Sequence, residues 1–180
     1  MSDGLDRFVE FVVHGLAIDK ETEMPILLLR DWARRLVLPI WIGRTEASAI
    51  ISGLEEIKLP RPSTHDLLTN VISAFGGQIR ALEITAIEDG AFLGVLKVTG
   101  PLGNDLSLDC RPSDGVAVAV RFDVPIRVAL PILDAARPLP EKEEKRQRMN
   151  VTSLDDEGGL AQLKATLASM EPDDFGEFET

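Results

Sequence analysis

Apolar and polar residues in the first part of the chain follow a pattern that predicts strands and then a helix. Residues 8–14, 25–29 and 36–42 are rich in β-branched or large apolar side chains, which is typical of strands. The segment 30–34 is short and polar enough to form the turn of a hairpin between the second and third strands. From Arg44 onward the period changes to that of one helical face, with apolar residues at Ala47, Ile50, Ile51, Leu54 and Ile57.

A second helix is predicted after Pro60, Arg61 and Pro62, which stop the first one. It has a helical stripe of its own and is closed by a pair of glycines. The stripe consists of Leu67, Leu68, Val71, Ile72 and Phe75.

The second half of the chain predicts more strands, again mixed with helices. Residues 78–87 and 91–98 form a predicted hairpin, because Asp89-Gly90 between them is a strong turn signal. We further expect a strand at 106–109, a buried helix at 116–120, a strand at 124–130 and a short helix at 132–136. Hairpins mixed with helices favour an α+β fold over a doubly wound sheet. The prediction is therefore a mixed, largely antiparallel sheet packed with three to four helices.

Composition changes near residue 140 and predicts three segments. Residues 1–140 form the α+β domain, 141–159 are a charged flexible linker, and 160–180 hold a short amphipathic helix and an acidic tail. The formal net charge is −11, of which residues 141–180 contribute −6 and residues 1–140 only −5. Because nonspecific binding to nucleic acid depends on Lys and Arg, this balance counts against it. A local basic groove on the mildly acidic domain remains compatible with the charge.

Several classes of protein are excluded by what the sequence lacks. No apolar stretch reaches the ~18 residues of a membrane span, and the N-terminal residues lack a signal-peptide pattern. We therefore expect a cytoplasmic protein that does not contact membranes. Cys110 is the single cysteine, so no internal disulfide framework is expected. Walker A, Gly-x-Gly-x-x-Gly and Gly-x-Ser-x-Gly motifs are absent, which argues against nucleotide-dependent enzymes and serine hydrolases.

One phrase occurs twice, as Arg61-Pro62-Ser63-Thr64 and Arg111-Pro112-Ser113-Asp114, each time before a predicted helix. A helix N-terminus offers free backbone N–H groups, and an adjacent arginine adds a donor fork, so the pair can hold an anion. The alternative is ordinary helix capping, for which Ser, Thr and Asp are the usual residues. The repeat, about 50 residues apart, also hints at a pseudo-repeat of two related halves.

The residues around these phrases include groups suited to phosphodiester hydrolysis. His65 or Asp66 is a candidate base, and Arg61 or Arg111 a candidate counter-charge for phosphate oxygens. Hydroxyls at Ser63, Thr64 and Ser113 are further substrate-binding candidates. Asp109 and Asp114 flank the second phrase as carboxylates that could hold a divalent ion. Structural salt bridges between these arginines and aspartates explain the same residues, and Glu46 is better explained by its place in the first turn of a helix.

Three blocks of the chain resemble the signature blocks of the bifunctional nuclease (BFN) domain family. They are Leu38-Pro39-Ile40-Trp41-Ile42-Gly43 with Glu46-Ala47, then Arg61-Pro62-Ser63-Thr64-His65-Asp66-Leu67-Leu68, then Asp109-Cys110-Arg111-Pro112-Ser113-Asp114-Gly115-Val116-Ala117. The phrase Pro172-Asp173-Asp174-Phe175-Gly176 is similar to the ending of many bacterial members.

The resemblance implies a compact α+β domain, self-association as a homo-oligomer with a dimer favoured, and nuclease activity on RNA and DNA. In one interpretation His65, Asp66, Asp109 and Asp114 gather with the two arginines in a cleft that hydrolyses nucleic acid, with Mg²⁺ or Mn²⁺ as a possible cofactor. In the other, the chain is a noncatalytic regulatory or binding module, and the same groups form a salt-bridge network.

Overall fold

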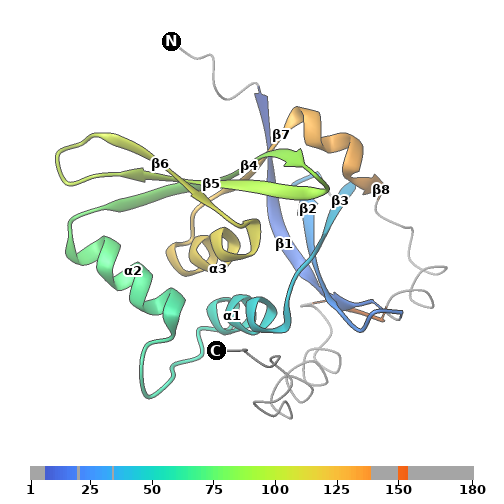
Figure 1. Ribbon diagram of the computed structural model, residues 1–180, viewed down its shortest axis with the longest axis horizontal. Coiled ribbons are helices and arrows are strands. Elements are labelled where there is room, and N and C mark those ends of the chain that lie inside the picture. Colours follow the sequence, from blue (N-terminus) through green and yellow to red (C-terminus); the bar gives the residue numbers. More distant parts are fainter. Residues whose placement is uncertain (1–6, 20, 34, 139–149, 154–180) are drawn as a thin grey trace.

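The computed structural model describes residues 7–19, 21–33, 35–138 and 150–153, in which one large sheet carries three α-helices on one side (Figure 1). This confirms the predicted α+β class. In chain order the elements are β1 (Phe8–Ile18), β2 (Pro25–Asp31), β3 (Leu36–Trp41), α1 (Arg44–Leu54), α2 (Thr64–Ala74), β4 (Gln78–Glu88), β5 (Ala91–Thr99), β6 (Asp105–Cys110), α3 (Pro112–Phe122), β7 (Ile126–Ala129), the 3-10 helix η2 (Leu130–Ala135), β8 (Arg137–Pro138) and β9 (Asn150–Ser153).

The sheet is mixed and largely antiparallel, as predicted. Its strand order is β6-β5-β4-β7-β1-β2-β3-β8, and β9 pairs with β1. Among the pairings of the described strands, only that of β4 with β7 is parallel. Strand β9 falls within the predicted linker 141–159, and the rest of that linker and the predicted tail helix lie outside the described residues.

Two halves of the fold have the same order of elements. Strands β1, β2 and β3 form an antiparallel meander followed by α1, and β4, β5 and β6 form a second meander followed by α3. Strand β7 joins the halves by pairing with both β1 and β4. The repeated Arg-Pro-Ser phrase precedes α2 and α3 rather than α1 and α3. The phrase therefore does not mark corresponding positions in the two halves.

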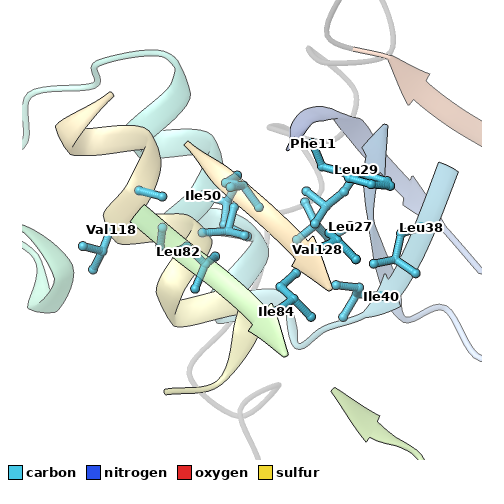
Figure 2. Packing of buried hydrophobic residues seen from close by; sticks show 14 of the residues in the cluster. Phe11, Leu27, Leu29, Leu38, Ile40, Ile50, Leu82, Ile84, Val118 and Val128 are labelled. Atoms are coloured by element: carbon cyan, nitrogen blue, oxygen red, sulfur yellow. The ribbon is translucent and has the colours of Figure 1, made fainter. Parts of the chain in front are cut away.

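The core lies between the sheet and helices α1 and α3 (Figure 2). Leu82 and Ile84 of β4 and Val128 of β7 are fully buried there, next to Ile50 of α1. Helix α3 is buried over most of its length, which confirms the expectation of an apolar helix at 116–120. A Cβ atom at Gly115 would overlap the Leu82 side chain. The small residue therefore lets the first turn of α3 approach β4 closely.

Helix α2 differs from the other two helices because none of its residues is buried. The predicted helix and its apolar stripe both exist, but most of the stripe is exposed to solvent. The exposed members are Leu67, Leu68, Val71 and Phe75. Ile72 alone from that stripe packs against the core. The pattern correctly predicts the helix, but the burial that such a stripe normally indicates is not found.

Several boundaries differ from the predicted ones. Helix α1 ends at Leu54 instead of continuing to Ile57, because Glu56 adopts a left-handed backbone with φ of 50°. Strand β1 continues to Ile18, four residues beyond the predicted end. The short helix predicted at 132–136 is a 3-10 helix that begins at Leu130.

Candidate functional site

The two Arg-Pro-Ser phrases begin their helices in different ways. Ser63 is the N-cap of α2 in a complete capping box, in which the Asp66 carboxylate accepts the Ser63 backbone N–H at 2.9 Å. At α3 the N-cap is Arg111, whose side chain makes no cap hydrogen bond, and Pro112 occupies the first helical turn. Capping thus explains the serine of the first phrase and leaves Arg111 of the second without a capping role.

His65 of α2 and Asp114 of α3 connect the two helix beginnings. His65 Nε2 lies 3.1 Å from Asp114 Oδ1, across 49 residues of sequence. Arg111 holds the same carboxylate through two bonds, with Nε donating to Oδ2 at 2.7 Å and Nη2 to Oδ1 at 3.2 Å. The structure therefore brings His65, Arg111 and Asp114 together, which are three of the six residues predicted from the sequence to share one cleft.

Glu46 completes this group from the first turn of α1. Its Oε1 lies 2.9 Å from Nη1 of Arg111. Glu46 of α1 and Asp114 of α3 therefore meet at one guanidinium group, and His65 of α2 joins them through Asp114. The partial positive charge of a helix N-terminus favours each of the two carboxylates. The sequence predicts Glu46 only as a helix-start residue, and its spacing from Arg111 gives no signal of this contact. We call Glu46, His65, Arg111 and Asp114 the helix-start cluster.

A second arginine, Arg121, joins the three helices outside the helix-start cluster. Its Nε donates to Asp66 Oδ1, and its Nη1 donates to the carbonyl oxygens of Ala49 and Ala117 at 2.9 and 2.7 Å. One side chain thus joins α1, α2 and α3, and only 9% of it is exposed. Arg121 is not among the residues predicted from the sequence. Its position directly after the apolar run 116–120 is a signal from which it could have been identified.

Hydrogen bonding holds both aspartates in the ionised form. The hydrogen bond from Arg121, with further bonds from Ser63, lowers the pKa of Asp66 to about 2. Burial opposes ionisation of Asp114, but hydrogen bonds from Arg111 and His65 outweigh it and hold its pKa below the usual value. The bond to Asp114 in turn raises the pKa of Arg111. Asp66, Arg111 and Asp114 therefore each have a partner that favours their charged form.

Other predicted site residues lie apart from this group. Arg61 is exposed in the loop before α2 and has no hydrogen-bond or ion-pair partner among the described residues. Thr64 is exposed at the first position of α2, and Ser113 is buried in the first turn of α3. Asp109 is exposed on β6, and no contact between described residues joins it to the helix-start cluster.

The side chains do not fit a metal site in the described part of the chain. No group of three or more His, Cys, Asp or Glu side chains gathers there in an arrangement that could hold an ion. Both oxygens of Asp114 already accept hydrogen bonds from Arg111. We therefore assign no step of any reaction to a metal.

A model of the bifunctional nuclease domain matches residues 27–140 of this chain. The chain belongs to the bifunctional nuclease domain family. The matched segment contains α1, α2 and α3, and with them the whole helix-start cluster. In the described residues, no helix is both long and apolar enough to cross a membrane.

Relatives of this family member include proteins without a described activity and plant nucleases. The uncharacterized protein Rv1829 of Mycobacterium tuberculosis is 34% identical over 166 residues, which cover 92% of this chain and 97% of that protein. Bifunctional nuclease 1 of Oryza sativa subsp. indica is 29% identical over 113 residues, or 61% of this chain and 34% of that protein. Bifunctional nuclease 2 of Arabidopsis thaliana is 26% identical over 105 residues, or 57% and 32%. The similarity to the plant nucleases thus covers about a third of their length.

Proposed function

We propose that this family member is a nuclease that hydrolyses phosphodiester bonds of RNA, DNA or both, with low sequence specificity. The observation that carries this proposal is the helix-start cluster, in which an exposed guanidinium is fixed beside a histidine–carboxylate pair. The domain shared with plant bifunctional nucleases supports the same reaction class.

His65 is the proposed general base. Since ionised Asp114 can only accept hydrogen bonds, His65 Nε2 carries the proton of their shared bond and Nδ1 keeps a lone pair. That lone pair can take a proton from an attacking water. Asp114 is then a positioning residue, because it fixes the ring orientation and the tautomer.

Arg111 is the proposed contact to phosphate oxygens. Three of its five N–H groups are used on Asp114 and Glu46, and 66% of the side chain is exposed. The two remaining N–H groups are free to stabilise the charge that develops on the phosphate. Arg61, without a carboxylate partner, and the exposed Thr64 hydroxyl are the proposed additional contacts to substrate.

The remaining predicted residues have other roles in this proposal. Asp66 orients α2 through Ser63 and Arg121, and its low pKa makes it a poor base. Ser113 is enclosed in the first turn of α3. Asp109 receives no step, since it makes no contact with His65 or Arg111.

A noncatalytic regulatory or binding module is the second candidate function. It is favoured by the pairing of charges: Arg111 and Arg121 face the carboxylates of Glu46, Asp66 and Asp114, so the arginines are neutralised by their neighbours. In this alternative the network only joins the three helices. The two candidates make opposite predictions for turnover and the same prediction for stability.

The test is hydrolysis of fluorescently labelled RNA and single-stranded DNA by the purified full chain, in Mg²⁺, in Mn²⁺ and in EDTA. We expect His65→Gln to lower the rate about 10²- to 10⁴-fold, the usual contribution of a general base. Asp109→Asn, an exposed carboxylate outside the helix-start cluster, is the matched control and should keep the rate. Equal rates in wild type and His65→Gln would exclude the proposed base. No turnover of either substrate in any condition would favour the noncatalytic module.

Self-association is the second part of this proposal, and the exposed stripe of α2 supports it. Leu67 and Val71 of α2, with Phe75 at its C-cap, expose apolar surface, and no residue of this helix is buried. Such patches mark protein interfaces. We propose that a second copy covers this stripe in a dimer. Light scattering after gel filtration should give a dimer for wild type and a monomer for a Val71→Asp, Phe75→Ser variant. A wild-type monomer at tens of micromolar, or an unchanged dimer in the variant, would contradict this interface.

A further inference from the structure

A cleft of about 230 Å³ lies on strands β4, β5, β6 and β7, away from the helix-start cluster. Its charged lining residues are Arg80, Glu83, Lys97, Asp105 and Arg127. Lys97 pairs with Ala81 and Ser107 across the neighbouring strands, whereas the adjacent Leu96 and Val98 are buried in the core. Because side chains alternate between the faces of a sheet, Lys97 points away from the helices. Figure 1 shows α1, α2 and α3 together on the other side of these strands.

The cations in this cleft differ from those among the helices in their partners. Arg80 Nε donates to the Thr99 hydroxyl at 3.1 Å, and Lys97 Nζ donates to the Ser107 hydroxyl at 2.7 Å. Neither has a carboxylate within ion-pair distance among the described residues. Neutral hydroxyls orient these two cations without cancelling their charge.

The two carboxylates of the cleft have partners other than Arg80 and Lys97. Glu83 lies 3.8 Å from Arg127, and Asp105 accepts a long 3.4 Å bond from the Thr99 hydroxyl. The lining therefore has three cations against two carboxylates. Arg80 and Lys97 form no ion pair with either carboxylate, and they lie on adjacent strands that are about 4.8 Å apart. Paired cations of this kind suit the oxygens of phosphate groups.

The size and position of the cleft favour a large ligand over a small one. Its volume is below the about 300–1,000 Å³ of pockets that enclose a whole small molecule. Only part of a ligand can lie inside, so the ligand continues outside. Strand β6 begins in the cleft at Asp105 and leads to Arg111, about 20 Å away at the usual rise per residue. As an edge strand, β6 offers a path between the two sites that does not cross the sheet.

We propose that the Arg80–Lys97 cleft binds the phosphate backbone of a single-stranded polynucleotide at a distance from the helix-start cluster. The choice of a polynucleotide rests on the proposed function, and the preference for phosphate rests on the cleft itself. Binding here gives affinity without base recognition, which agrees with low sequence specificity.

The experiment is fluorescence anisotropy of a labelled 20-nucleotide oligo(dT) with the full chain at several salt concentrations, with gel analysis to confirm that the probe stays intact. Each phosphate contact on a single strand contributes about 0.7 to the slope of log K against log salt. The Arg80→Gln, Lys97→Gln variant should lower that slope by about 1.4 and weaken binding roughly 20-fold at 0.1 M salt. Arg137→Gln, on the exposed surface of β8, is the matched control and should bind like wild type.

Two further measurements distinguish a wrong ligand, a wrong binding site and a failure of the nuclease proposal. Inorganic phosphate should compete only weakly, since it replaces one contact of several; full competition at low millimolar phosphate would overturn a polynucleotide ligand. Unchanged affinity and salt slope in the double variant, with circular dichroism showing a native fold, would overturn the cleft. If the chain binds the oligonucleotide through Arg80 and Lys97 but hydrolyses neither RNA nor DNA, the nuclease proposal is refuted and this inference stands.

Discussion

The same three residues, Arg-Pro-Ser, stand at the start of α2 and of α3, and yet the two helices have opposite environments. Helix α3 buries seven of its residues, whereas α2 buries none. Arg111 before α3 is held by two carboxylates, whereas Arg61 before α2 has no partner among the described residues. The shared residues place a helix start in both segments, but at different positions of the phrase, since the N-cap is Ser63 in α2 and Arg111 in α3. The helix sequence after the phrase determines burial, because Val116–Ala119 is apolar on every side and α2 is apolar along one stripe only.

The sharpest way to test this comparison is to remove each arginine in turn. Arg111→Gln should lower kcat/KM for RNA about 10²- to 10³-fold, the usual cost of losing a preorganised donor at the developing charge. Arg61→Gln removes an exposed, unpaired cation and should cost about tenfold or less, mostly in KM. Steady-state kinetics on one labelled substrate measures both. Equal losses in the two variants would mean that the pairing of Arg111 has no catalytic importance.

Burial of the two helices can be compared by truncating one valine in each. Val118→Ala leaves a hole in a fully buried site and should lower the free energy of unfolding by about 2–3 kcal/mol. Val71→Ala, at a position that is 43% exposed, should change it by less than about 0.5 kcal/mol. Urea denaturation at low protein concentration measures both, since dilution limits any contribution from self-association. A large loss for Val71→Ala would indicate that α2 is covered.

Arg121 tests how the two helices are joined. Arg121→Gln removes the charge that faces Asp66 and at least one of the bonds to Ala49 and Ala117, and should cost about 2 kcal/mol of stability. The figure lies below the about 3–5 kcal/mol for a fully buried pair that loses one partner, because Asp66 is 32% exposed. Arg44→Gln is the control, since its pair with Glu23 is exposed and 4.0 Å apart. Equal melting temperatures for the two variants would contradict a structural role for Arg121.

The sequence predicted most strands and helices of this fold because their signals are local. The Asp89-Gly90 turn, the alternation in β4 and the Ser63 cap each depend on residues a few positions apart. The exposure of α2 and the contacts of Arg121 and Glu46 depend on how distant segments pack, which no local pattern contains. His65 and Asp114 were found as candidates from their residue types and helix-start positions. Their contact across 49 residues required coordinates.

The smallest expected effect is the pH dependence that Asp66 gives to α2. Its pKa falls from an ordinary value near 3.8 to about 2 on folding, because Arg121 and Ser63 bond the ionised carboxylate. A lowered folded pKa stabilises the fold above the unfolded pKa, and this contribution disappears as pH falls from about 4 to about 2. With a discount for solvent screening of a group that is 32% exposed, the effect is about 1 kcal/mol. Urea denaturation at pH 5, 4 and 3 should therefore show a shallower loss of stability in Asp66→Asn than in wild type. Asp109→Asn, whose carboxylate is exposed on β6, should retain the wild-type slope, and parallel curves for all three proteins would mean that the Asp66–Arg121 bond does not contribute to stability in solution.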